Sequence, residues 1–267
     1  MKEITPILKA KPPKKYHLSS PKRRGSIRRN LAAINGFACA VRLGEWSSTV
    51  YKSNKPFPLF YTDTRFYNSY QARYANEQPT AWETLGHYEQ MLVFAYGIIT
   101  LPGPRNWWLF TSHLDELKLD RLRDEESPPT FLGNELRRTF QRRGLEVDYV
   151  IKLEKDLRHH KPHVHGLIRV QSDDRDFVRK SLNVAMGEWV DQKGKSFQTD
   201  VRNNGGKRAA WARYMTKYPA TTRRFLAEED IQTRQVISAS NAVRTHSRAL
   251  WDEVHKFAKL EARRKSA

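Results

Sequence analysis

The sequence predicts an α+β fold, namely an antiparallel, ferredoxin-like (RRM-like) sheet with helices on one face, a basic N-terminal tail and a C-terminal helix. Two observations support this prediction. Between residues 105 and 218, segments rich in β-branched and aromatic residues alternate with segments of helical periodicity. Their order is strand, helix, strand, strand, helix, strand, helix, and the first six elements give the β-α-β-β-α-β order of a ferredoxin-like sheet.

The first strand and first helix follow clear turn signals. A strand is expected over Asn106–His113 (NWWLFTSH), directly after a Pro-Gly-Pro turn. Pro128 and Pro129 then precede a helix that starts near Thr130. The apolar residues of this helix share one face, which predicts that they enter the core: Leu132, Leu136 and Phe140.

A hairpin is expected next. Residues 146–155 (EVDYVIKLEK) and Pro162–Val170 (PHVHGLIRV) both have strand composition, and the short segment 158–161 between them is a candidate hairpin loop. The two strands should therefore lie side by side in the sheet.

The second half of the pattern is helical with one short strand. A helix is expected after Asp173, which is a candidate N-cap, and a short strand over Phe197–Val201. A further helix should run over Lys207–Tyr218 and be stopped by Pro219. A long amphipathic helix is expected over about residues 239–262.

The chain divides into four regions. Residues 1–30 form a basic arm that should be disordered in isolation, because it has many lysines, arginines and prolines and few apolar residues. Residues 31–104 are predicted to be an irregular accessory region, 105–221 the core domain and 222–267 a C-terminal helical extension. Within the accessory region, Met91–Leu101 is the longest apolar run and is expected to be a core strand or helix.

Charge and composition restrict the partners. The chain of 267 residues has a net charge of +19 and an isoelectric point of about 10.1, which predicts binding to a polyanion, most simply a nucleic acid. An anionic membrane surface is the competing polyanion, although no membrane partner is expected. No segment reaches the roughly 18 apolar residues of a membrane span. Cys39 is the single cysteine, which excludes an internal disulfide and fits a reducing cytosol.

Two histidines are candidate metal ligands. His163 and His165 are two apart in a predicted strand, so both side chains should project from one face. A lone His-x-His is common on solvated strands, but here the preceding strand supplies a carboxylate, either Glu154 or Asp156. Two imidazoles and one carboxylate leave open coordination positions and suit Mg²⁺ or Mn²⁺.

A helix downstream carries a candidate nucleophile. Tyr214, Lys217 and Tyr218 have i, i+3 and i, i+4 spacing, so all three can share one face of the predicted helix. On their own, the tyrosines of such a pattern would be expected to pack into a core and the lysine to be solvated.

The combined motifs resemble the HUH endonucleases, a family of rolling-circle replication initiators, relaxases and certain transposases. The resemblance covers about residues 105–220, under half of the chain. Three motifs match in order: Leu109-Phe110-Thr111-Ser112, then His163-Val164-His165 with Pro162 before and Gly166 after, then Tyr214-Met215-Thr216-Lys217. The segment 213–218 (RYMTKY) is especially similar to the initiators of phages and plasmids.

The resemblance implies an activity. His163, His165 and Glu154 would hold Mg²⁺ or Mn²⁺, Tyr214 would attack a phosphodiester of single-stranded DNA, and Lys217 would offset phosphate charge. The product would be a 5′-phosphotyrosine with a free 3′-hydroxyl. Tyr218 matches the second tyrosine of two-tyrosine initiators, but the family pattern is broken by Pro219 directly after it, so its role as a second nucleophile stays open.

The resemblance also implies a setting. A phage or plasmid initiator would nick single-stranded DNA or a hairpin origin in the cytoplasm of a bacterial host, and it would borrow a host helicase, since the sequence has no Gly-x-x-x-x-Gly-Lys-Ser/Thr motif. A transposase or relaxase is the alternative within the family. From a different class, a non-catalytic RRM-like nucleic-acid-binding protein would share the sheet and the charge, but it would leave the histidine pair and the Tyr-x-x-Lys helix unexplained.

Overall fold

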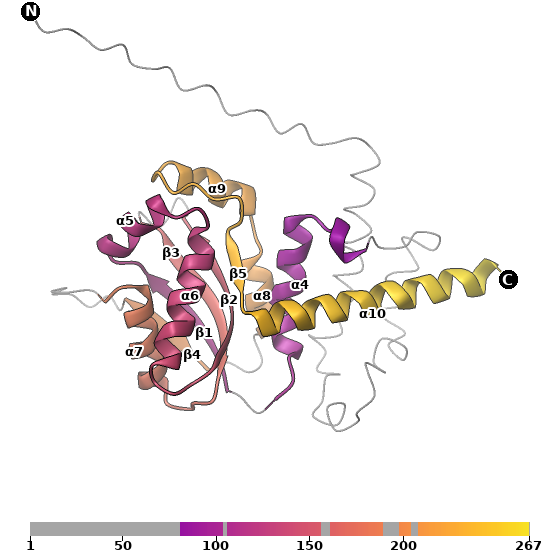
Figure 1. The fold of residues 1–267 in the computed structure, drawn as a ribbon, viewed down its shortest axis with the longest axis horizontal. Helices are drawn as coiled ribbons and strands as arrows, with labels where there is room; N and C mark the ends of the chain where they lie inside the picture. Colours follow the sequence, from indigo (N-terminus) through magenta and orange to yellow (C-terminus); the bar gives the residue numbers. More distant parts are fainter. Residues whose placement is uncertain (1–80, 104–105, 156–160, 189–197, 204–207, 267) are drawn as a thin grey trace, which may run out of the picture.

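A computed structural model describes residues 81–103, 106–155, 161–188, 198–203 and 208–266 (Figure 1). The basic arm expected over residues 1–30 lies outside these ranges, as do residues 31–80 of the accessory region and Asp156. The predicted domain boundaries therefore stay predictions. None of the helices in the described ranges has both the length and the apolar character needed to cross a membrane.

The described residues form a five-stranded, fully antiparallel sheet in the order β4-β1-β3-β2-β5. The strands are β1 (Asn106–His113), β2 (Val147–Glu154), β3 (His163–Val170), β4 (Thr199–Arg202) and β5 (Ile237–Ala239). The sequence predicted the first three within a residue and β4 within two. It did not predict β5, which adds a strand from the expected helical extension to the edge of the sheet beside β2.

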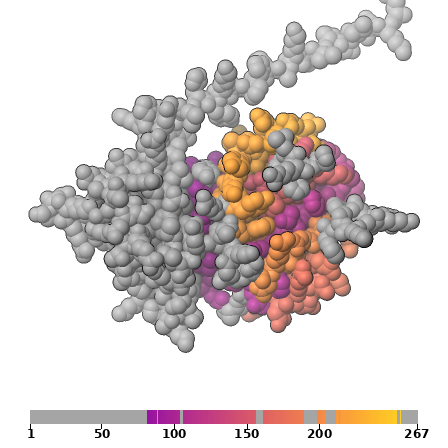
Figure 2. All heavy atoms as spheres, turned by 180° about the vertical axis from the view of Figure 1, so that it is seen from behind, coloured from indigo at the N-terminus to yellow at the C-terminus, as the bar shows by residue number. Residues whose placement is uncertain are grey.

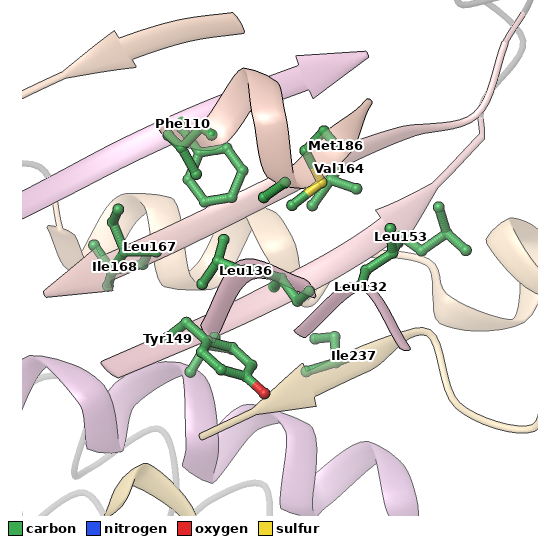
Figure 3. Close-up of a cluster of buried hydrophobic side chains, with 14 of the residues drawn as sticks. Phe110, Leu132, Leu136, Tyr149, Leu153, Val164, Leu167, Ile168, Met186 and Ile237 are labelled. Carbon is green, nitrogen blue, oxygen red and sulfur yellow. The ribbon is translucent and has the colours of Figure 1, made fainter. Parts of the chain in front are cut away.

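One face of the sheet carries the main hydrophobic core under α6 (Pro128–Gln141) and α7 (Arg175–Met186). The prolines occupy the first helical positions of α6, where their missing N–H groups have no intrahelical partner to lose. Figure 3 shows the packing in this cluster, with labels that include Phe110, Leu132, Leu136, Val164 and Met186. The three residues predicted for the core side of α6, Leu132, Leu136 and Phe140, are fully buried as predicted.

The other face of the sheet is also covered, which corrects the prediction of helices on one face. The covering helices are α4 (His87–Thr100), α8 (Arg208–Met215) and α10 (Asn241–Ser266), which lie across the sheet from α6 and α7 in Figure 1. The apolar region Met91–Leu101, predicted as a core strand or helix, therefore belongs mainly to helix α4. In the view from behind, α8 and α9 form part of the orange surface (Figure 2). Because both faces are covered, all residues of β2 and β3 are buried.

The chain after α7 differs from the prediction in one way that affects the site. Helix α8 ends at Met215, not at Tyr218. Tyr218 adopts a left-handed conformation with φ 51° and caps a new helix, α9 (Pro219–Ala227), in which Pro219 is at the first turn. Pro219 therefore starts a helix and does not stop α8, which has already ended at Met215. Helix α5 (Glu116–Asp124) and the short 3-10 helix η2 (Trp82–Thr84) were not predicted either.

A buried polar network fastens α4 and α10 to the sheet. Arg169 of β3 forms an ion pair with Asp148 of β2 at 3.0 Å and donates to the carbonyl of Leu101, just beyond α4. Nearby, the His246 Nε2 of α10 lies 2.9 Å from the Thr100 hydroxyl of α4. Burial, together with the positive charge of Arg169, lowers the pKa of His246 to about 4.

Acid should therefore weaken the fold through His246. Unfolded histidine titrates near pH 6.5, so the contribution of the neutral imidazole is complete above that pH and is lost as the pH falls toward 4. We expect the unfolding free energy to drop by up to about 3 kcal/mol over this window. Urea unfolding at a series of pH values should show a smaller drop for His246→Gln than for the wild type; equal pH profiles would contradict this.

Gly166 should be required by the packing of β1 on β3. A Cβ at Gly166 would collide with the ring of Phe110, its cross-strand partner, which is itself buried. We expect Gly166→Ala to lower the free energy of unfolding by about 1–3 kcal/mol, because the ring has to move within a packed core. Chemical denaturation measures this loss. Adding Phe110→Leu should recover part of it, and an undiminished stability of Gly166→Ala would refute the packing argument.

Candidate metal centre

The two histidines lie on the face of β3 that is covered by α8, as strand alternation predicts. The antiparallel register pairs His163 with Glu154 of β2 and with His113 of β1, and it pairs His165 with Lys152 and Thr111. His163 is fully buried, and His165 and Glu154 are nearly so. The sheet itself therefore brings the predicted third ligand beside the histidine pair.

The spacing of the three side chains suits a divalent cation. The two Nε2 atoms lie 3.0 Å apart, and the His165 Nε2 is 3.3 Å from the Glu154 Oε2. All three candidate ligand atoms fall within 4.8 Å of one another. Neighbouring ligand atoms around a divalent ion held octahedrally at about 2.1 Å lie about 3 Å apart, so these two distances fit a divalent cation.

The hydrogen bonds of these residues also fit a metal. The Nδ1 of His163 lies 3.3 Å from the carbonyl of Lys161, which can only accept, so this contact favours the tautomer with the proton on Nδ1 and the lone pair on Nε2. The Glu154 Oε2 is buried and accepts no hydrogen bond. A buried carboxylate oxygen without a donor is costly, and a bound cation would remove that cost. The residues present therefore fit a divalent metal.

Two further residues hold the ligands in place. The Thr111 hydroxyl lies 2.8 Å from the Nδ1 of His165, and the Lys152 ammonium donates to the Glu154 Oε1 at 2.7 Å. Groups of this kind fix the orientation and tautomer of metal ligands. Thr111 belongs to the first of the three sequence motifs, and the structure gives it a contact with the second.

Helix α8 brings Tyr214 to the same place. The indole N–H of Trp211 donates to the Gly166 carbonyl at 2.9 Å, which docks α8 on β3. The Trp211 and Tyr214 rings stack with centroids 5.3 Å apart, and the Tyr214 hydroxyl lies 3.3 Å from the Nε2 of His165. Tyr214 is 36 % exposed, so the residue that carries this hydroxyl reaches the protein surface beside the candidate ligands.

Lys217 and Tyr218 are placed differently from Tyr214. Both follow the end of α8, so the prediction that they share its helical face is wrong. The Lys217 ammonium still lies 5.8 Å from the centre of the Tyr214 ring, because the chain turns back at the helix end with a bond from the Lys217 N–H to the Tyr214 carbonyl. Tyr218 is 73 % exposed in its left-handed conformation.

Sequence reasoning missed three residues of this neighbourhood. Lys152 looks like an ordinary strand lysine, and Trp211 like a core aromatic. His113 ends β1, and its ring centroid is 5.7 Å from that of His163. The only sequence signal for His113 was its period-two spacing from Thr111, which places the two on one face.

No protein-family model, curated protein sequence or solved structure matches this chain. What the structure supports is therefore a buried group of two histidines and one glutamate that can hold a divalent metal ion, in an α+β protein with an antiparallel sheet.

Thr111 should strengthen metal binding by orienting His165. We expect Thr111→Val to weaken Mn²⁺ binding by about 10- to 100-fold, which is the usual effect of losing a hydrogen bond to a ligating histidine. Isothermal titration calorimetry with Mn²⁺ measures this change. Ser112→Ala is the matched control, because the Ser112 hydroxyl bonds Thr199 at 2.6 Å and Ser112 alternates with Thr111 to the other face of β1. Equal Mn²⁺ affinities in Thr111→Val and the wild type would contradict this role.

Proposed function

We propose that this protein is a metal-dependent endonuclease that nicks and rejoins single-stranded DNA through Tyr214. One observation carries the proposal: the Tyr214 hydroxyl and the candidate ligands Glu154, His163 and His165 converge from β2, β3 and α8. A tyrosine hydroxyl next to a site for a divalent cation is an arrangement suited to covalent phosphodiester cleavage.

In the proposed mechanism, each of these residues has a defined role. A divalent cation on the triad would polarise the scissile phosphate and offset its developing charge. The Tyr214 phenol loses its proton to solvent and its oxygen attacks phosphorus. The new tyrosine–phosphate bond forms as the bond to the 3′ oxygen breaks, and that oxygen takes a proton from solvent. The tyrosine–phosphate bond conserves the free energy of the broken phosphodiester bond, so rejoining the DNA needs no nucleotide cofactor. Lys217 is near enough to the Tyr214 ring to offset phosphate charge.

The fold and the motifs together support the HUH family as the source of this chemistry. The strand order β4-β1-β3-β2, with α6 after β1 and α7 after β3 on the same face, is the ferredoxin-like arrangement. The three motifs lie on β1, on β3 and at the C-terminal end of α8, and side chains from all three meet at His165. The net charge of +19 suits the DNA backbone.

Within that family we favour an initiator of rolling-circle replication from a phage or plasmid. It would act on single-stranded DNA or a hairpin origin in the bacterial cytoplasm, together with a host helicase. A transposase or relaxase would use the same chemistry on another DNA site.

A passive RRM-like binder fits the structure less well. Such proteins bind bases on an open sheet face. Here β2 and β3 are buried along their whole length, and α4, α8 and α10 cover the face that would bind. The sheet therefore offers no open platform over these strands.

Covalent capture tests the proposal. The full-length protein is incubated with Mn²⁺ and a random-sequence pool of 3′-labelled single-stranded oligonucleotides, and adducts are resolved on a denaturing gel. We expect a labelled adduct that disappears with EDTA, in His163→Ala and in Tyr214→Phe, because each removes the metal or the nucleophile. Sequencing the captured DNA gives the cleavage site.

Tyr218→Phe is the matched control for the nucleophile. It should keep the first adduct, because Tyr218 lies beyond α8 and Tyr214 lies beside His165. An adduct that survives Tyr214→Phe and vanishes in Tyr218→Phe would show that the nucleophile is misassigned. Tight DNA binding without any adduct in Mg²⁺ or Mn²⁺ would refute the endonuclease and favour the passive binder.

A further inference from the structure

Lys152 is a fully buried lysine next to the candidate metal centre. It lies two residues before the end of β2, where the register pairs it with His165 on β3 and with Ile237 on β5. Its side chain has no exposed surface. Burying an ammonium group is costly unless it is paired and hydrogen-bonded, so the contacts that hold it are informative.

The first contact is with the carboxylate ligand. The Lys152 ammonium donates to the Glu154 Oε1 at 2.7 Å, and the other carboxylate oxygen, Oε2, lies toward His165. Lys152 therefore fixes the rotation of this carboxylate and assigns its two oxygens to different tasks. One oxygen is held by the protein, and the other is left to the metal position.

The second contact is with the segment that carries the nucleophile. The same ammonium donates to the Lys217 carbonyl at 2.9 Å, two residues beyond the end of α8. A cation at a helix C-terminus also interacts favourably with the carbonyl ends of the helix. This bond ties the turn after α8 to β2, and the turn begins directly after Tyr214 and Met215.

We propose that Lys152 is a positioning residue that joins the metal site to the nucleophile: one ammonium group holds both the Glu154 carboxylate and the Lys217 carbonyl. Only the part of this proposal that concerns Tyr214 as the nucleophile rests on the proposed function. By this bond Lys152 sets the distance between the metal position and Tyr214. A side chain without a hydrogen-bond donor at this position would hold neither group.

Lys118 provides a matched comparison. It is also a buried lysine and forms an ion pair with Glu135 at 3.0 Å, but it joins α5 to α6. Its removal breaks an ion pair of the same type without touching β2, β3 or α8. A general loss of stability should appear in both variants, and a change at the metal centre should appear only at Lys152.

The experiment compares Lys152→Met with Lys118→Met in the full-length protein. Mn²⁺ alone is titrated by calorimetry, and thermal melting gives the folded fraction. We expect Lys152→Met to weaken Mn²⁺ binding by about tenfold or more and Lys118→Met to leave it unchanged. In a Glu154→Gln background, Lys152→Met should change the Mn²⁺ affinity by less than about twofold, because its effect passes through that carboxylate.

The second measurement is the rate of adduct formation at saturating Mn²⁺, with the oligonucleotide recovered by covalent capture. We expect Lys152→Met to stay at least about tenfold slower than the wild type even when the metal site is full, because the turn after α8 has lost its tie to β2. Lys152→Gln keeps a donor and should retain part of both properties. It replaces Lys152→Met if that variant does not fold.

The outcomes are separable. If a folded Lys152→Met protein keeps its Mn²⁺ affinity, or if Lys118→Met loses as much Mn²⁺ affinity, then Lys152 does not position the Glu154 carboxylate. If Lys152→Met forms the adduct at the wild-type rate at saturating Mn²⁺, then the bond from Lys152 to the Lys217 carbonyl does not position Tyr214. If the wild type forms no adduct, the proposed function fails, and the Mn²⁺ titrations alone decide whether Lys152 positions the carboxylate.

Discussion

Strand β3 is buried on both faces along its whole length, so each of its side chains has to be satisfied inside the protein. The face toward α6 and α7 has only apolar residues and a glycine, with Gly166 leaving space for the Phe110 ring. The opposite face carries His163, His165 and Arg169, which all need polar partners. The rest of the structure supplies those partners, from neighbouring strands and from α4 and α8.

The polar residues on that face are arranged in two groups with an apolar middle. At one end Arg169 pairs with Asp148, and at the other end the histidines meet Glu154 and Lys152. Val150 and Leu167, both fully buried, separate the groups. One group anchors helices and the other is the candidate metal centre. A buried charge in either group depends on its partner, because an unpaired one is strongly destabilising.

The sequence predicts the three central strands of the sheet well, and it misses the short edge strand β5. Strands β1, β2 and β3 have eight residues each, enough to show composition and turn signals, and they carry all three candidate ligands. Strand β5 has three residues, which is too few for any period. Helix α4 is apolar on most of its surface, so periodicity cannot separate it from a buried strand.

The residues around the candidate ligands were harder to predict from the sequence than the ligands themselves. Ideal helical geometry placed Lys217 and Tyr218 with Tyr214, but the chain leaves the helix at Met215 and Tyr218 takes a left-handed conformation. Lys152 carries no sequence signal, since a lysine in an alternating strand normally faces water. Its position inside the protein follows from β5 and the turn after α8, and neither was visible in the pattern.

Strand β5 has a consequence for how the protein is made. Val150 of β2 pairs with Ala239 of β5. During synthesis, β2 therefore emerges about a third of the chain length before β5, the strand that covers its outer edge. Until then the backbone of the strand that carries Lys152 and Glu154 is a sheet edge, which is the kind of surface on which chains pair with one another. Contacts this distant in sequence also slow folding. The segment beyond residue 236, which supplies no ligand, therefore protects the strand that does.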